Sequence, residues 1–187
     1  DSPMALGALQ IYRQAIAEGW SEIRPDIAGG AEAFEPGEVH EARTVADSMA
    51  LNAPRRPVIA VSASGMATGG RVVHHLKHLL PDPRHTVVLP GYQAVGTRGR
   101  DLAEGASEVK IHGEWVPVRA QIEVIEGFSV HADADEMLTW LAGAPTPPSM
   151  TYVVHGEPDA SDALRIRIKD ELGWKVRVPQ HGETVEA

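Results

Sequence analysis

The chain has 187 residues, enough for one medium or two small domains, and its 43% hydrophobic and 23% charged residues are ordinary for a globular protein. It contains no cysteine, which excludes disulfides and thiolate metal sites and favours a reducing, cytoplasmic location. The formal net charge of −9 disfavours general attraction to a polyanion, so a nucleic-acid site would need a local positive patch, backbone donors or metals. No apolar run approaches the roughly 20 residues that span a bilayer, so no membrane partner is expected.

The first part of the chain predicts helices separated by a loop. There is no initiator methionine, and we expect the chain to be a piece of a longer protein. Ser2 and Pro3 are typical of a helix start, a hydroxyl N-cap followed by proline at the first helical position. Ala8, Tyr12, Ile16 and Trp20 then recur at steps of four, which predicts one apolar helix face. We expect a loop over residues 21–37 and a second helix over residues 38–51.

Two apolar runs, residues 58–61 and 86–89, predict strands buried on both faces of a parallel sheet. Each run leads into a glycine-rich loop, residues 62–70 and 91–100, and a helix is expected over residues 71–80. Ligands bind beyond the carboxyl ends of the strands in such sheets. The two loops are therefore expected to lie together at one binding edge.

From about residue 108 the pattern changes to short strands, mixed or antiparallel, with helices between the later ones. Asp133 and Glu136 have the spacing of a capping box at the start of one of these helices. The elements expected in this part are strands at residues 109–111, 115–118, 122–125, 152–154 and 176–178, and helices at residues 134–141 and 160–172.

Two histidines, His131 and His155, follow predicted strands. An imidazole at that place can bind a metal or act as an acid or base near neutral pH, but it can equally be a hydrogen-bonded structural histidine. The alternation of His131, Asp133 and Asp135 would also permit a metal site, although we favour the capping role for Asp133.

Helix positions His74 and His78 have a spacing that can bind zinc, but leucines interleave with them and a solvated helix face is favoured. The loop over residues 62–70 is neither a dinucleotide fingerprint nor a Walker A sequence, and could still hold a phosphate on free backbone N–H groups. Arg71, Arg98 and Arg100 flank the loops, where they are either phosphate ligands or ordinary surface charge.

Taken in order, five motifs resemble those of the β-CASP nucleases, a group with a metallo-β-lactamase fold that includes the mRNA 3′-end processing endonuclease and bacterial ribonuclease J. The resemblance covers essentially the whole chain. The motifs are Asp1-Ser2-Pro3-Met4-Ala5, Ser64-Gly65-Met66 with Gly69-Gly70, Gly91-Tyr92-Gln93-Ala94 with Gly96-Thr97, Phe128-Ser129-Val130-His131-Ala132-Asp133, and Val154-His155-Gly156-Glu157.

The resemblance implies an α/β fold in two parts. Residues 1–107 would be most of a β-CASP domain, a parallel sheet with flanking helices. Residues 108–187 would be the returning, C-terminal part of a metallo-β-lactamase αββα domain.

The resemblance also implies the chemistry, which is hydrolysis of RNA phosphodiester bonds with two zinc ions in the full-length enzyme. His131 matches the histidine of motif B, with an implied catalytic role in proton transfer, and His155 matches motif C, an implied zinc ligand typical of RNA-directed members. The two glycine-rich loops would hold the RNA strand through Ser64, Gly65, Gly69, Gly70, Arg71, Gly96, Thr97 and Arg98.

One departure from the family pattern matters for activity. The family's His-x-His-x-Asp-His motif is absent, so only His155 can be carried over as a zinc ligand, whereas a catalytic zinc normally needs three protein ligands. We expect this chain alone to bind no zinc at the family site, to be inactive, and to form a homodimer through exposed apolar surface. The alternatives are a non-catalytic RNA-binding or scaffold module of the same family and a Rossmann-type nucleotide-binding protein.

Overall fold

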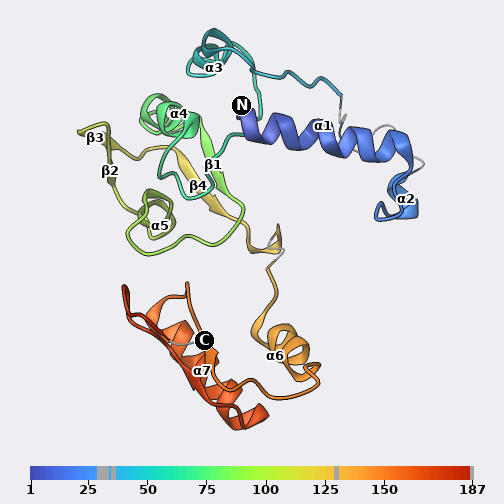
Figure 1. Ribbon diagram of the computed structural model, residues 1–187. Coiled ribbons are helices and arrows are strands. Elements are labelled where there is room, and N and C mark those ends of the chain that lie inside the picture. Colours follow the sequence, from blue (N-terminus) through green and yellow to red (C-terminus); the bar gives the residue numbers. More distant parts are fainter. Residues whose placement is uncertain (29–33, 35–36, 129–130, 186–187) are drawn as a thin grey trace. The chain divides into compact units, whose positions relative to one another are not determined.

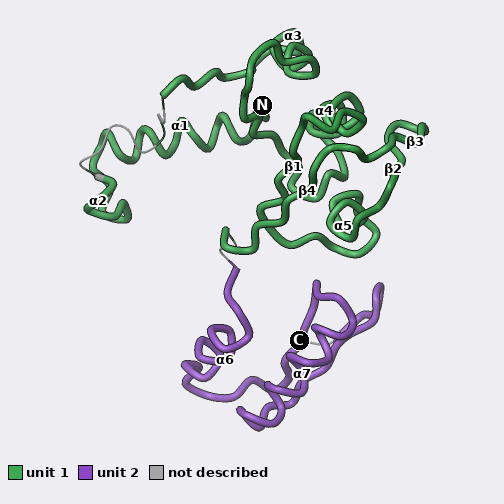
Figure 2. Tube along the Cα trace, turned by 180° about the vertical axis from the view of Figure 1, so that it is seen from behind, with its two compact units in different colours: residues 1–129 green, residues 130–187 purple. Residues whose placement is uncertain are grey.

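The computed structural model describes residues 1–28, 34, 37–128 and 131–185, and divides into two compact units, residues 1–129 and 130–187 (Figures 1 and 2). No helix in the described ranges is long and apolar enough to cross a membrane. In chain order the elements are α1 (Pro3–Glu18), α2 (Pro25–Ala28), α3 (Val45–Ala50), α4 (Arg71–Leu79), β1 (Thr86–Leu89), α5 (Arg98–Ala103), β2 (Glu108–Ile111), β3 (Glu114–Pro117), β4 (Gln121–Val124), the 3-10 turn η1 (Glu126–Phe128), α6 (Ala134–Ala142), β5 (Thr151–Tyr152), α7 (Pro158–Leu172) and β6 (Val176–Arg177).

The core of the first unit lies between α4, α5 and two small sheets. Strands β1 and β4 pair in parallel, with Thr86 opposite Gln121, and β2 and β3 pair antiparallel, with Val109 opposite Val116. The mixture of parallel and antiparallel pairs confirms the prediction of a changed pattern near residue 108. The core is apolar throughout, and its largest fully buried side chains are Leu80, Leu102, Val109 and Ile111.

The hairpin between β2 and β3 turns at His112 and Gly113, which both have positive φ, 49° and 87°. A two-residue hairpin loop with positive φ at both positions matches the twist of the flanking strands. Histidine tolerates this backbone region better than most side chains do. The turn therefore places His112 at the exposed tip of the hairpin.

The start and end of α1 confirm the sequence prediction, but its buried face does not. Ser2 caps the helix by accepting a hydrogen bond from the Ala5 N–H at 3.3 Å, and Gly19 ends it in the left-handed region. Ala15 is the buried helix residue, whereas Tyr12 and Trp20 are about half exposed.

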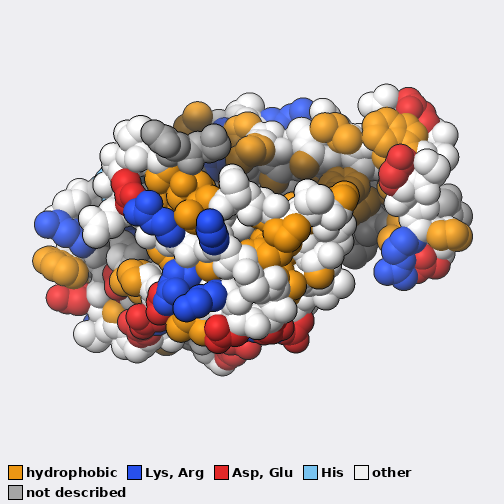
Figure 3. Space-filling model, turned by 60° about the horizontal axis from the view of Figure 1, so that its bottom comes forward, with side chains coloured by type: hydrophobic (Ala, Val, Ile, Leu, Met, Phe, Trp, Pro, Cys, Tyr) orange, Lys and Arg blue, Asp and Glu red, His pale blue; other side chains and the backbone are white. Residues whose placement is uncertain are grey.

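Four predictions for the first unit are wrong or incomplete. The predicted loop over residues 21–37 contains the short helix α2, and the predicted loop over residues 91–100 already contains the start of α5 at Arg98. The apolar run over residues 58–61 forms no strand, and Ile59 is 94% exposed, because no strand in the described ranges pairs with this run. The predicted helix over residues 38–51 shrinks to α3, which begins at a capping box of Thr44 and Asp47. Figure 3 shows how hydrophobic side chains reach the surface between charged ones.

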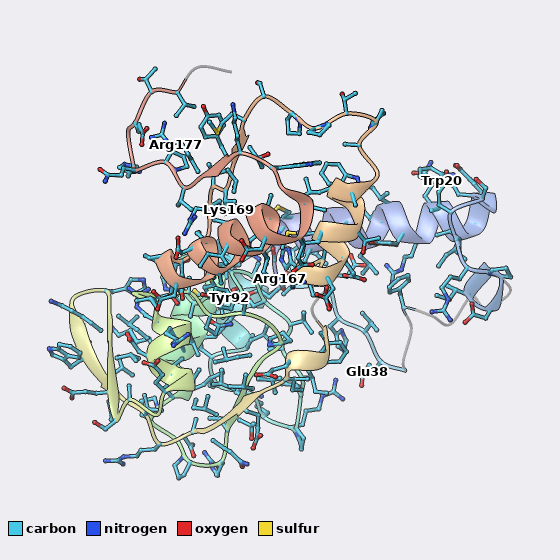
Figure 4. All side chains as sticks on the ribbon, turned by 90° about the horizontal axis from the view of Figure 1, so that it is seen from below. Trp20, Glu38, Tyr92, Arg167, Lys169 and Arg177 are labelled. Atoms are coloured by element: carbon cyan, nitrogen blue, oxygen red, sulfur yellow. The ribbon has the colours of Figure 1, made fainter. Side chains whose placement is uncertain are left out.

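The second unit has a separate, smaller core, in which Leu138 of α6, Val153 and Ile168 of α7 pack together. Strands β5 and β6 pair in parallel. Arg167, labelled on α7 in Figure 4, pairs with Asp135 of α6 at 2.8 Å and with Glu171 of its own helix at 2.7 Å. The apolar contacts hold this unit together, and the exposed pair between α6 and α7 adds little to them.

Candidate functional site

The structure brings the two glycine-rich loops of the first unit together, as the sequence predicted. The Gly99 N–H donates to the Met66 carbonyl at 3.0 Å, and the buried Gln93 side chain donates to the Gly65 carbonyl at 3.2 Å. Gly99 permits this approach because a Cβ there would lie 1.7 Å from the Gln93 Oε1 atom and 3.1 Å from the Met66 carbonyl carbon. The loops are therefore tied by backbone contacts and not only by neighbouring side chains.

A cavity of about 330 Å³ opens where these loops meet α4 and the β2–β3 turn. Four of the eight predicted phosphate ligands line it, namely Gly69, Gly70, Arg71 and Arg98. Thr68 and Val73 also contribute to its wall, together with His74 and His112. Among the described residues no carboxylate lines this cavity, although the whole chain carries a net charge of −9.

Both arginines of the cavity are engaged in holding the backbone. Arg71 pairs with the Asp1 carboxylate at 2.6 Å and donates to the carbonyl of Ala42 at 3.0 Å. Arg98 donates to the carbonyls of Ala67 at 2.9 Å and Lys110, which fastens the first loop to β2. The Asp1 carboxylate balances the charge of Arg71, and much of the donor capacity of both arginines serves the scaffold.

The other four predicted ligands hold the loops and do not line the cavity. Thr97 is the N-cap of α5, where its hydroxyl accepts from the Arg100 N–H at 3.3 Å. The Ser64 and Thr68 hydroxyls lie 3.2 Å apart, and the Gly65 carbonyl accepts from Gln93. Gly96 lies just before this N-cap, with φ of 79°.

The amino-terminal end of α4 faces the cavity with free donors. Its N-cap, Gly70, provides no side-chain hydrogen bond, and no acceptor within the described ranges takes the N–H of Gly69, Gly70 or Arg71. The positive end of a helix dipole and unpaired N–H groups together favour an anion.

Sequence reasoning missed two of the cavity's residues. The sequence predicts a solvated helix face for His74 and indicates no role for His112. The two exposed imidazole rings come from elements that are distant in sequence, and their centroids lie 4.6 Å apart. The only signal in the sequence for His112 is the His-Gly pair between two short strands, typical of a tight hairpin turn.

Reasoning from the sequence also missed a buried polar cluster beneath α4. The Asp1 carboxylate is fully buried and contacts Arg71, Ser48 and the His75 Nε2 atom, the last at 2.7 Å. The other ring nitrogen of His75 lies 2.7 Å from the Asn52 amide oxygen. Burial lowers the pKa of His75, and the positive charge of Arg71 acts in the same direction. The cluster joins α1, α3 and α4, which supports the cavity from behind.

In the second unit, the two predicted histidines occupy comparable positions. His155 follows β5 and is exposed, with φ of 66°, two residues before the N-cap of α7 at Glu157. His131 is also exposed and lies two residues before the N-cap of α6. The preceding motif residues Ser129 and Val130 lie outside the described residues. Neither imidazole is buried in the apolar core, and their roles remain predictions.

The carboxylate of Asp133 has the capping role that the sequence favoured. Its side chain accepts from the Glu136 N–H at 2.9 Å, and the Glu136 side chain accepts from the Asp133 N–H at 3.1 Å. These two hydrogen bonds provide acceptors for two backbone N–H groups that have no partner within the helix at the start of α6. Asp133 is therefore engaged in fixing the helix that follows His131.

Comparisons with known proteins place the chain in a family. Residues 1–102 match the Beta-Casp domain, and residues 115–179 match the Zn-dependent metallo-hydrolase RNA specificity domain. The chain is 37% identical over 185 residues to a ribonuclease of Thermus thermophilus, an alignment that covers 99% of this chain and 42% of the relative.

Two archaeal relatives agree with this assignment. Identity is 33% over 182 residues to the transcription termination factor FttA of Pyrococcus abyssi, covering 94% of this chain and 26% of the relative. Identity is 38% over 146 residues to an RNase J-like protein of Methanocaldococcus jannaschii, covering 78% of this chain and 33% of the relative. The chain spans less than half the length of these curated relatives. The two matched domains and the ordered motifs show that the chain belongs to the β-CASP family of metallo-β-lactamase-fold nucleases.

Proposed function

We propose that this chain is the RNA-engaging portion of a zinc-dependent ribonuclease that hydrolyses RNA phosphodiester bonds. The observation that carries the proposal is the match of both domains, one of them described by RNA specificity and zinc-dependent hydrolysis. The ribonuclease of Thermus thermophilus matches along almost the whole of this chain, which supports the same reaction. The cavity, whose lining among the described residues contains no carboxylate, adds a surface suited to the sugar-phosphate backbone.

Within this proposal the two exposed histidines of the second unit take different tasks. His155 is a zinc ligand, and His131 transfers a proton at the scissile phosphate. When bound, zinc supplies a Lewis acid and an activated water. The described residues hold no group of three His, Asp or Glu side chains that could hold a metal ion, and a catalytic zinc normally takes three protein ligands. The remaining zinc ligands are assigned to parts of the enzyme outside these 187 residues.

The organisation of the parent enzyme follows the same proposal. We assign residues 1–107 to the β-CASP domain and residues 108–187 to the returning part of an αββα hydrolase domain that holds two zinc ions. The absence of cysteine favours a cytoplasmic location. Exposed apolar side chains such as Ile59, Val61 and Trp140 favour a homodimer of the isolated chain. Sedimentation at rising concentration tests this, and a monomer throughout contradicts it.

A chimera tests the catalytic roles. This chain replaces the matching segment of the Thermus thermophilus ribonuclease, and zinc content and RNA cleavage are measured. We expect His155→Ala to lower bound zinc and abolish cleavage. His131→Ala is expected to retain zinc and lower the rate by about 100- to 10,000-fold, the usual contribution of a general acid or base.

The matched control is His181→Ala, because His181 is an exposed histidine of the same unit outside both motifs. It should leave zinc content and rate unchanged. Full zinc and full activity in His155→Ala would contradict the assignment. A folded chimera that binds RNA without cleaving it would favour the non-catalytic RNA-binding module instead.

A further inference from the structure

A second hollow of the first unit lies at the β2–β3 hairpin, where α5 packs against β2 (Figure 1). Its volume is about 590 Å³, and its wall includes Asp101 and Glu104 of α5, Glu108 and Lys110 of β2, and Trp115 of β3. We call it the Trp115 recess. Arg98 is the one residue that it shares with the cavity at the glycine-rich loops, so the recess is a separate surface among the described residues.

Trp115 is held out of the core by the register of the hairpin. Val109 and Val116 are opposite each other in the ladder and both are buried, so the next pair, Lys110 and Trp115, faces away from the core. Trp115 is therefore 62% exposed. A large indole ring that the core does not use is a feature of binding surfaces, where tryptophan dominates the energy of contact.

The carboxylates of the recess are only partly neutralised. Glu104 pairs with Arg100 at 2.6 Å on the surface of α5. Asp101 and Glu108 are exposed, and no cation among the described residues forms an ion pair with either of them. Two carboxylates beside the indole ring therefore keep their capacity to accept hydrogen bonds from a charged donor.

The two cations of the recess differ in what they hold. The guanidinium of Arg98 donates to the carbonyls of Ala67 at 2.9 Å and Lys110, so its donors serve the backbone. The Lys110 ammonium is exposed, and a flexible lysine stem lets such a group stay in water. Three carboxylates against two cations leave the wall net negative, which favours a cationic partner.

We propose that the Trp115 recess binds an arginine side chain of a partner protein. The planar guanidinium stacks on the indole ring, and its N–H groups donate to the carboxylates of Asp101 and Glu108. Protein interfaces are enriched in tryptophan and arginine, whereas an RNA strand would bring its phosphates against these carboxylates. The recess thus gives the chain a protein-binding surface that does not depend on the proposed ribonuclease function.

The test uses the 187-residue chain and two short peptides. One carries a single arginine, and the other carries citrulline in its place, which has a similar shape without the charge. Binding is followed by NMR through the indole N–H signal of Trp115, assigned by its loss in Trp115→Ala. We expect the arginine peptide to shift this signal and to bind about tenfold more tightly than the citrulline peptide.

Two variants separate the recess from general surface charge. Asp101→Asn/Glu108→Gln removes both charges at nearly constant size, and the preference for arginine over citrulline should disappear. The control is Trp140→Ala, because Trp140 is 80% exposed on α6 of the second unit. This variant should keep the full preference and the same shift of the Trp115 signal.

Equal affinity for the two peptides, or an unchanged preference in the double variant, would overturn the inference. A single-stranded RNA that shifts the Trp115 signal and displaces the arginine peptide would also overturn it, because the recess would then be an RNA site. In the chimera described above, Trp115→Ala should leave RNA cleavage unchanged. An inactive chimera whose Trp115 signal still responds to arginine would remove the ribonuclease proposal and leave this one standing.

Discussion

The glycine-rich loops of the first unit and the histidine junctions of the second are built in different ways. The loops are tied to each other by backbone hydrogen bonds, as between Gly99 and Met66, and form a defined cavity. The histidines lie on short connections before α6 and α7, each followed by a helix N-cap. The difference indicates that the loops form one cavity within the first unit, whereas the two histidine junctions lie at the starts of two separate helices.

Among the substitutions that test this comparison, Gly99→Ala is expected to lower the free energy of unfolding the most. The new methyl group would lie 1.7 Å from the Gln93 Oε1 atom, and the buried Gln93 side chain cannot move away without breaking the contact between the loops. We expect the free energy of unfolding to fall by about 1–3 kcal/mol, the usual cost of overpacking. Urea denaturation measures the change.

Gly91→Ala is the matched control for this substitution, because Gly91 lies in the same loop with no atom within 4 Å of an added Cβ and without positive φ. Its stability should change by less than about 0.5 kcal/mol. Equal effects of the two substitutions would show that the loops are not held by close approach at Gly99.

A smaller loss of stability is expected from a substitution at Gly156, next to His155. A Cβ at Gly156 would lie 2.5 Å from the buried Ser161 hydroxyl in the first turn of α7, but 3.7 Å from its Cβ. Gly156→Ala should therefore cost about 1 kcal/mol, because a single hydroxyl can rotate away. The measurement is a double-mutant cycle with Ser161→Ala by urea denaturation.

In the background of Ser161→Ala, the added methyl group meets no close atom, so the cost of Gly156→Ala should nearly vanish. An equal loss of stability from Gly156→Ala in both backgrounds would mean that the backbone beside His155 cannot accommodate a side chain at position 156.

The smallest expected effect concerns pH and the cluster behind the cavity. Because burial lowers the pKa of His75, the unfolded chain takes up this proton at a higher pH than the folded chain does. The free energy of unfolding should therefore decrease as the pH falls through about 6.5, the ordinary value for histidine. Urea midpoints near pH 7.5 and pH 5.5 measure the change.

In His75→Gln the free energy of unfolding should decrease less between pH 7.5 and pH 5.5. His78 is exposed on the same helix, and His78→Gln should show the same decrease as the unsubstituted chain. An equally strong decrease in His75→Gln would exclude His75 as its source.

Local signals in the sequence determined where α1 and α6 start and where α1 stops. Ser2 with Pro3, Gly19, and the pair of Asp133 and Glu136 act on the backbone within one helical turn, so their effect can be read without knowing the rest of the fold. The short strands near residues 109–124 were predicted for the same reason, since alternation and turns are local patterns. The ordered motifs identified the family.

The apolar run over residues 58–61 shows what local patterns cannot decide. Its composition is typical of a buried strand, but a strand also needs a partner for its backbone groups, and the described ranges provide none. The exposure of Tyr12 and Trp20 has the same cause, because the apolar face of α1 is buried only where another element packs against it.

The cavity was predicted only in part. Gly69, Gly70, Arg71 and Arg98 could be proposed from the sequence because they flank loops that a sheet brings together. His74 and His112 could not, because their proximity depends on how the tip of the β2–β3 hairpin lies against α4. Sequence alone determined the local capping, the turns and the family, whose causes act over a few residues. Tertiary structure decided which side chains meet, because packing joins residues that are far apart in the chain.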